Sequence, residues 1–268
     1  MEFDIIKLKE IDSTNKYCYK LGKKGKRNLI VVSDIQTGGV GRLERKWYSN
    51  FGGLYFSMLL DLEEFKKRCS NNNIGKLNFL GSLSVVETLK CYLKNGNNTY
   101  NDIDNNINDN NKVNSAKYNN NNNLGIKFPN DVIVRINNND KKLSGILSEV
   151  NMNYGFLVLG VGVNINNSIP NEIKDIAISL KELGGKEFDR FNILDKYICN
   201  FENNYFLDDD KILKKYKRYS LTIGKYVKII TPNKEIKGKV LNIDYNGIYL
   251  ENHNEIEHIS VGDCIHLR

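Results

Sequence analysis

The chain has 268 residues, which predicts one large domain or a large domain with a small one attached. Hydrophobic residues make up 40% and charged residues 26%, as in globular proteins, and no apolar run reaches the roughly 18 residues that span a membrane. Met1–Lys9 lacks the basic start and apolar core of a signal peptide, so we expect a soluble, cytoplasmic protein with no membrane partner. The five cysteines lie far apart and predict reduced, buried thiols rather than a zinc site or disulfides.

The net charge is +7, from 39 Lys and Arg against 32 Asp and Glu. Such an excess suits nucleic acid or an anionic small molecule, but Lys, Asn and Ile are all abundant together. A compositional bias explains the charge best, and we expect no specific nucleic acid partner.

The first two thirds of the chain alternate between strand and helix patterns. Polar residues at 12–15 can cap a helix that reaches Lys24, and Leu77–Leu93 carries apolar residues at helical spacing. A loop rich in glycine and cations at Gln36–Asn50 separates two strands. The expected strands are Leu29–Ile35, Gly53–Leu62, Ile126–Phe128, Val132–Ile136, Leu143–Asn151 and Phe156–Val163, with a polar turn at Asn137–Lys141. The expected later helices are Phe191–Tyr205 and Lys211–Tyr219.

Two segments have a different composition. Between about 95 and 123, roughly half of the residues are Asn and few are aliphatic, which predicts a disordered insertion without function. After Ser220 the chain becomes a series of short strands, expected at Lys225–Thr231, Ile236–Ile243, Gly247–Glu251 and Ile256–Ser260. We therefore predict an α+β domain at 1–219 and a small β domain at 220–268.

Familiar catalytic sets are absent from the larger predicted domain. The three histidines, His253, His258 and His266, all fall in the small β domain, which argues against a Ser–His–Asp or Cys–His arrangement elsewhere. We expect them to be half-exposed strand residues rather than metal ligands. No P-loop sequence for phosphate binding occurs either.

Four polar clusters instead follow the apolar strands. They are 12–15, 36–47, 127–131 together with 142–149, and 160–166. The second carries three cations among glycines, whose backbone N–H groups can approach an anion closely, and arginine suits phosphate or carboxylate. Because ligands of open α/β sheets bind at strand ends, the residues predict a site for an anionic small molecule.

In this order and spacing, the clusters resemble the biotin protein ligase family. The family's Ser-Thr-Asn element matches 13–15, its glutamine matches Gln36, and the glycines and second arginine of its biotin loop match Gly39, Gly41 and Arg42. Its Lys-Trp-Pro-Asn-Asp, Lys-Leu-x-Gly-Ile-Leu-x-Glu and Gly-x-Gly-x-Asn motifs match 127–131, 142–149 and 160–164. The resemblance implies a mixed-sheet catalytic domain like that of biotin and lipoate ligases, followed by an SH3-like β-barrel.

Three departures from the family pattern stand out. Val40 replaces the first arginine of the biotin loop, Leu43-Glu44 replaces a more basic and glycine-rich pair, and Phe128 replaces a tryptophan. Because the matching sequence starts within the first ten residues, it leaves no room for the winged helix of the family's repressor members. We therefore expect a monofunctional ligase.

The resemblance implies a reaction in two steps. Biotin and ATP give biotinyl-5′-AMP and pyrophosphate, and a lysine of a biotin carboxyl carrier domain then takes the biotinyl group, with Mg²⁺ arriving on ATP. The implied biotin-binding residues are Ser13, Thr14, Asn15, Gln36, Gly39, Val40, Gly41, Arg42, Trp47, Lys142 and Gly145. The implied nucleotide-binding residues are Arg42, Asn130, Asp131, Lys142 and Asn164, of which Arg42 and Lys142 are also expected to be catalytic. No protein metal site is implied, and a homodimer stays open.

Simpler interpretations also stay open. Ser13 and Thr14 can serve only to cap a helix, Arg45 and Lys46 can be solvated loop charges, and Trp47 can be a core anchor. A lipoate–protein ligase is the nearest alternative function, and pyrophosphate release with biotin or lipoate would separate the two. A non-catalytic basic binding protein is a further alternative, against which the lack of a nucleic acid recognition motif argues.

Overall fold

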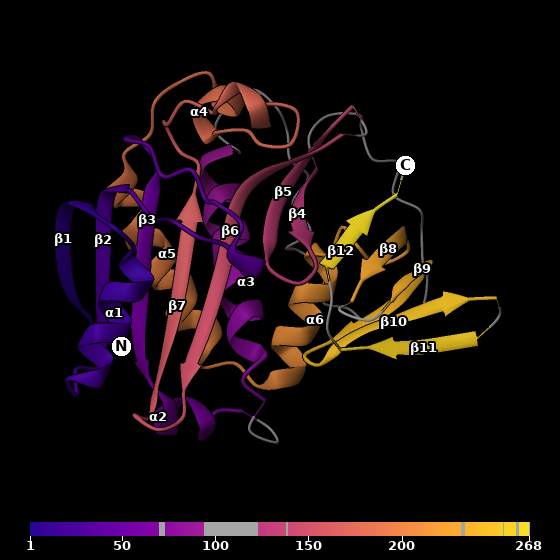
Figure 1. Ribbon diagram of the computed structural model, residues 1–268, viewed down its shortest axis with the longest axis horizontal. Coiled ribbons are helices and arrows are strands. Elements are labelled where there is room, and N and C mark those ends of the chain that lie inside the picture. Colours follow the sequence, from indigo (N-terminus) through magenta and orange to yellow (C-terminus); the bar gives the residue numbers. More distant parts are fainter. Residues whose placement is uncertain are drawn as a thin grey trace.

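The computed structural model describes residues 1–69, 73–93, 123–137, 139–231, 234–253, 255–260 and 263–267. These residues form a large sheet with helices on both faces and a smaller sheet beside it, made by the C-terminal strands (Figure 1). The mixed α+β architecture expected from the sequence is confirmed.

The large sheet has seven strands in the order β1-β2-β3-β7-β6-β5-β4. β1 pairs parallel with β2, and the other pairings in this sheet are antiparallel. The strands are β1 (Asp4–Ile11), β2 (Leu29–Gln36), β3 (Leu54–Asp61), β4 (Asn123–Lys127), β5 (Asp131–Ile136), β6 (Asn139–Asn151) and β7 (Phe156–Val163). A helix between β1 and β2 supplies the long crossover that a parallel pair needs.

Helices cover the two faces of this sheet unequally (Figure 1). One face carries α1 (Thr14–Lys23), and the other carries α3 (Lys76–Leu93), which packs against α5 (Arg190–Tyr205) and α6 (Asp209–Tyr219). Two short helices, α2 (Leu62–Lys66) and α4 (Leu180–Gly184), lie near opposite ends of the strands. None of the helices in the described ranges is both long enough and apolar enough to cross a membrane.

The residues of β7 point alternately to the two faces of the large sheet. Phe156 and Val158 pack under α1, whereas Leu157 belongs to the core on the α3 side. Because side chains alternate along a strand, Gly160 and Gly162 continue the α1 face past the beginning of that helix. These glycines have no side chain to fill the space above them, so this part of the sheet can form the floor of a cavity.

The smaller sheet is antiparallel throughout, with strand order β11-β10-β9-β8-β12. Its strands are β8 (Tyr226–Ile230), β9 (Glu235–Asp244), β10 (Gly247–Asn252), β11 (Glu255–Ile259) and β12 (Asp263–His266). Hydrogen bonds attach it and the preceding segment to the rest of the chain, among them Leu221 N to Ile126 O at 2.8 Å and Tyr245 Oη to Asp209 O at 2.7 Å. The domain boundary at 219/220 and the SH3-like character remain predictions.

Most expected elements are present, but α2, α4 and two strands were not predicted and one turn is shorter than expected. β1 and β12 were not predicted, because β1 is an edge strand with many exposed residues and β12 is only four residues long. The polar turn expected at Asn137–Lys141 is shorter, since β6 already begins at Asn139 and pairs Asp140 with Arg135 on β5. The insertion expected at 95–123 lies outside the described residues, apart from Asn123 at the start of β4.

The cysteines also differ from expectation. They were expected to be buried, but only Cys18 and Cys264 are, whereas Cys91 and Cys199 are exposed. Burial raises the pKa of the Cys18 thiol to about 12, which keeps it protonated and unreactive.

Candidate active site

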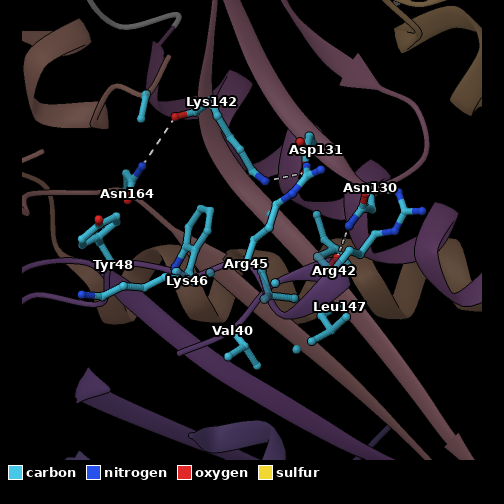
Figure 2. Close-up of a pocket in the computed structure, with 18 of the residues that line it drawn as sticks. Val40, Arg42, Arg45, Lys46, Tyr48, Asn130, Asp131, Lys142, Leu147 and Asn164 are labelled. Carbon is cyan, nitrogen blue, oxygen red and sulfur yellow. Dashed lines mark hydrogen bonds and ion pairs between the residues drawn. The ribbon is translucent and has the colours of Figure 1, made fainter. Parts of the chain in front are cut away.

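A cavity of about 430 Å³ opens over the glycine part of the large sheet (Figure 2). Its walls come from the start of α1, from the loop of residues 36–50 (the glycine loop), from β5, β6 and β7, and from β12. Thirteen of the fourteen residues proposed from the sequence line it: Ser13, Thr14, Asn15, Gln36, Val40, Gly41, Arg42, Trp47, Asn130, Asp131, Lys142, Gly145 and Asn164. The remaining one, Gly39, is not among the lining residues.

Glycines form the floor because neighbouring side chains occupy the space above them. A Cβ on Gly160 would lie 2.0 Å from Asn15 Oδ1, and one on Gly162 would lie 2.4 Å from Trp47 Nε1. On β6, a Cβ on Gly145 would lie 3.3 Å from the same indole ring. Any larger residue at the first two positions would therefore displace a side chain of the cavity wall.

A neutral polar cluster closes one end of the cavity, over β2 and β3. Gln36 Oε1 accepts hydrogen bonds from the backbone N (2.9 Å) and the Oγ1 (3.1 Å) of Thr14, and Gln36 Nε2 donates to Ser49 Oγ at 2.9 Å. A Cβ on Gly39 would lie 2.7 Å from Ser49 Oγ and 3.3 Å from Gln36 Nε2. Gly39 does not face the cavity, but its lack of a side chain leaves room for the hydrogen bond between Gln36 and Ser49.

Ser57 on β3 extends the cluster and was not found from the sequence. It is fully buried, with its Oγ 2.7 Å from Thr14 Oγ1 and 2.6 Å from Asn15 Oδ1. Asn15 Nδ2 in turn donates to Glu149 Oε2 at 2.8 Å. Ser13 caps α1, since its Oγ accepts from the helix backbone at 3.4 Å, and it also lines the cavity, so the two interpretations do not exclude each other.

The other end of the cavity, over β5 and β6, carries Lys142 and Arg42, which Figure 2 shows beside Asp131 and Asn130. Lys142 Nζ lies 2.7 Å from Asp131 Oδ1 and 5.1 Å from the centre of the Trp47 ring. Arg42 Nη1 donates to Asn130 Oδ1 at 3.5 Å. Trp47 packs on the glycine floor and also lines the cavity, so it can be a packing anchor and part of the cavity wall at once.

The glycine loop has an unusual backbone where its sequence departs from the family. Leu43 and Glu44 have φ values of +54° and +56°, in the left-handed region. This region costs residues other than glycine about 1–2 kcal/mol each, and a glycine-rich pair would adopt it without that cost. Val40 lines the cavity and forms a backbone bridge with Lys46. Arg45 and Lys46 are exposed, as solvated loop charges would be, and they also line the cavity.

The carboxylates that line the cavity are already paired with cations. Asp131 meets Lys142, and Asp140 meets Arg135 with a 2.6 Å contact between Oδ1 and Nε. Among the described residues, no three His, Cys, Asp or Glu side chains gather where they could hold a metal ion. A cation that arrives on a phosphate ligand would thus depend mainly on phosphate and water oxygens.

Several lining residues had no sequence signal. They are Tyr48, Ile133, Asp140, Ile173, Ile176, Ala177, Cys264 and Ile265. The segment around Ile176 reaches the cavity because Lys142 N donates to Ile176 O at 2.8 Å, a pairing between segments far apart in the chain. Only contacts that form in the folded chain place these residues together.

The fold and the cavity together identify the class of protein. Residues 8–166, more than half of the chain, match the family model described as Biotin/lipoate A/B protein ligase family, and the chain belongs to that family. The resemblance indicated by the sequence motifs is confirmed.

Particular relatives agree with this assignment. The Bifunctional ligase/repressor BirA of Bacillus subtilis is 28% identical over 259 residues, which cover 91% of this chain and 68% of the relative. Biotin--protein ligase 2 of Arabidopsis thaliana is 28% identical over 185 residues, or 66% of this chain and 45% of the relative. The solved structure of biotin protein ligase from Aquifex aeolicus in complex with biotin and ATP is 30% identical, with a TM-score of 0.74 and 97% of both chains covered.

Proposed function

We propose that this chain is an ATP-dependent biotin–protein ligase that joins biotin to a lysine of a biotin carboxyl carrier domain. The observation that carries the proposal is a single cavity with a neutral polar cluster at one end and two cations, Arg42 and Lys142, at the other. Biotin has a neutral ureido ring at one end and a carboxylate at the other, which suits this arrangement. The names of the relatives, and the Aquifex structure with biotin and ATP, support the same function.

The reaction proceeds through an acyl-adenylate. A carboxylate oxygen of biotin attacks the α-phosphorus of ATP, the bond to the β-phosphate breaks, and pyrophosphate leaves. The uncharged amine of an acceptor lysine then attacks the carbonyl carbon of biotinyl-5′-AMP, AMP leaves, and the nitrogen loses a proton. Neither step requires a protein nucleophile, so catalysis consists of positioning and charge stabilisation.

The neutral cluster would bind the ureido ring. Thr14 and Gln36 hold one another, and Ser57 holds Thr14 from beneath, so their polar atoms are fixed before a ligand arrives. A ligand that hydrogen-bonds to fixed groups loses less freedom on binding than one that must order them. The uncharged ring also avoids the cost of burying a charge at this closed end.

The two cations would act where negative charge gathers during adenylation. The ammonium of Lys142 has three hydrogens, and Asp131 accepts one of them, which leaves donors for a carboxylate or phosphate oxygen. Arg42 offers a planar fork of N–H groups on the neighbouring side of the cavity. Removing one such preorganised donor typically lowers a rate by about 10²–10³-fold.

ATP would enter with Mg²⁺ as part of the substrate. Asn130, Asp131 and Asn164 lie at the cation end, where the nucleotide would bind. Asn164 is held by a 3.1 Å hydrogen bond from Asn167 Nδ2, and its own Nδ2 reaches Lys142 O at 3.5 Å. These contacts hold Asn164 beside the lysine that would bind the reacting groups.

One experiment tests the function directly. The chain is incubated with biotin, ATP–Mg²⁺ and a biotin carboxyl carrier domain, and the acceptor mass is measured. We expect the mass of one biotinyl group to be added, and only when all components are present. An unchanged acceptor together with no pyrophosphate release from biotin would contradict the proposal.

Lipoate is the competing substrate because the family includes lipoate ligases. The same pyrophosphate-release assay with lipoate in place of biotin separates the two functions. We expect pyrophosphate release with biotin and not with lipoate, because lipoate has no ureido group to pair with Thr14 and Gln36.

We expect no specific binding to nucleic acid. The net charge of +7 comes from lysines spread along the chain, which gives weak and salt-sensitive attraction. Nanomolar, sequence-dependent binding to duplex DNA at physiological salt would contradict this expectation.

A further inference from the structure

His266, the last residue of β12, reaches out of the smaller sheet and contacts the large one. Its Nδ1 lies 2.7 Å from Asp140 Oδ2 on β6, and its Nε2 lies 3.0 Å from Thr222 Oγ1. The His266 side chain is 9% exposed, so the expectation that the histidines of the small domain are half-exposed is wrong for this residue. A buried polar ring that bridges two sheets suggests a role beyond surface packing.

The surrounding groups form a continuous hydrogen-bonded chain. Arg135 on β5 holds Asp140 through two contacts, Nε to Oδ1 at 2.6 Å and Nη2 to Oδ2 at 3.1 Å. At the other side of the imidazole, Thr222 Oγ1 accepts a hydrogen bond from Phe128 N at 3.0 Å. The network therefore runs from β5 and β6 through His266 and Thr222 to the backbone just after β4.

A neutral imidazole can make the hydrogen bonds to both Asp140 and Thr222. With the proton on Nδ1, His266 donates to Asp140, and its Nε2 accepts from the Thr222 hydroxyl. Burial lowers the pKa of His266, and the neighbouring Lys127 and Arg135 add to this effect, whereas Asp140 opposes it. The direction of the shift favours this neutral form.

The order Thr222–His266–Asp140 resembles that of a catalytic triad, but it cannot act as one. Thr222 is fully buried, and neither Thr222 nor His266 lines the cavity. A hydroxyl nucleophile must meet its substrate, and this hydroxyl has no access to any. The network must therefore act through the residues that it holds.

Those residues belong to three parts of the cavity wall. Phe128 lies two residues before Asn130, and Asp140 lies two residues before Lys142. Ile265, which lines the cavity, directly precedes His266. All three parts belong to the cation end of the site, while the neutral cluster lies over β2 and β3.

We propose that His266 is a positioning residue that docks the smaller sheet against the cavity and thereby fixes the part of the site that binds ATP. The proposal rests on the proposed function. Because the network touches only the half of the cavity over β5 and β6, its loss should weaken ATP binding and leave biotin binding almost unchanged.

The test compares KM for ATP with KM for biotin. His266→Ala removes both hydrogen bonds. We expect KM for ATP to rise about 10-fold, the size that corresponds to the loss of one charge-assisted hydrogen bond. We expect kcat and KM for biotin to stay within about twofold of the wild-type values. His266→Asn keeps a donor near Asp140 and is expected to recover part of the loss. Calorimetric titration with ATP–Mg²⁺ should show the same order of affinities.

His258→Asn is the matched control. His258 is a histidine on β11 of the same sheet, contacts Asp244 at 3.3 Å, and does not line the cavity. We expect wild-type kinetics from this variant. Thr222→Val, which deletes one hydroxyl with little change in shape, should raise KM for ATP as well, because Phe128 N loses its acceptor.

Two results would overturn the positioning role. One is an equal rise in both KM values, and the other is a drop in thermal stability with both KM values unchanged. If His266→Ala does not fold, an unchanged KM for ATP in Thr222→Val overturns the role instead. A wild-type chain that releases no pyrophosphate would refute the proposed function, and calorimetry with ATP–Mg²⁺ would still test the network.

Discussion

Arg42 and Lys142 are held in different ways within one cavity. Lys142 projects from β6 and forms a 2.7 Å ion pair with Asp131, so a strand and a carboxylate fix its ammonium. Arg42 sits on the glycine loop, next to two residues at positive φ, and meets Asn130 at 3.5 Å. The position of Arg42 thus depends on the loop conformation, and Val40 supplies no second guanidinium there.

Arg42→Gly is expected to lower the adenylation rate by about 10²–10³-fold, because one preorganised donor is lost from the developing charge. The variant should also release biotinyl-5′-AMP, which would then biotinylate nearby lysines non-specifically. Pyrophosphate release and the release of labelled intermediate measure the two effects. Val40→Arg, which adds a cation, should slow the escape of biotinyl-5′-AMP or leave it unchanged. If Arg42→Gly kept the wild-type adenylation rate and the wild-type retention of the intermediate, Arg42 would not be part of the site.

At the scale of elements, the glycine loop and the sheet floor fit each other. Trp47 lies over β6 and β7 only because Gly145 and Gly162 leave room for its ring. The polar cluster depends on the same principle, since Asn15 occupies the space above Gly160. We therefore expect substitutions in the loop and in the floor to be energetically coupled.

Gly162→Ala tests this fit. Its Cβ would lie 2.4 Å from Trp47 Nε1, so the ring must move, with an expected cost of about 1–3 kcal/mol in the free energy of unfolding and at least a 10-fold loss of adenylation. Trp47→Phe in the same chain removes the colliding indole nitrogen and should recover part of the stability. Denaturant unfolding of the single and double variants measures this coupling, and a double variant no more stable than Gly162→Ala would contradict the explanation.

Polar contacts connect the two sheets and the helices between them. Lys76, 1% exposed, pairs with Asp209 at 2.6 Å on α6, and Tyr245 from the smaller sheet donates to the backbone of Asp209. The His266 network forms a second connection beside the cavity. Because both connections are buried, separating the sheets would leave polar groups without partners, and we expect the two sheets to unfold together.

Stability should fall as the pH drops through the ordinary pKa of histidine, 6.5. The folded chain holds His266 neutral and its pKa lowered, so below about pH 6.5 the unfolded chain binds the extra proton and folding loses up to about 1.4 kcal/mol per pH unit. Burial alone would raise the pKa of Asp140, but hydrogen bonds from His266 and Arg135 lower it, so its contribution is lost only below the usual carboxyl pKa of 3.8. Urea unfolding at pH values from about 7.5 to about 5 measures how the free energy of unfolding depends on pH. This dependence should be weaker in His266→Asn than in the wild type. An unchanged dependence would show that His266 is not the group that titrates.

Deleting residues 96–122 and joining the ends with a short linker should leave ligation nearly intact. The segment is dominated by Asn and has too few aliphatic residues to form a core of its own. Acceptor mass and thermal unfolding of the deletion variant provide the measurement. A large loss of either activity or stability would show that the segment has a structural role.

Elements with a complete local pattern, and the motifs that mark the site, could be predicted from the sequence. The apolar spacing of α3 and the apolar run of β7 are complete within their own residues, and the clusters at 13–15, 127–131 and 142–149 carry the family resemblance directly. The remaining strands and the His266 network depend on tertiary contacts. β1 and β12 are stabilised by pairing with β2 and β8, and His266 meets Asp140 across 126 positions of the chain. Those contacts depend on groups distant in sequence, which neither residue type nor spacing reveals before the chain has folded.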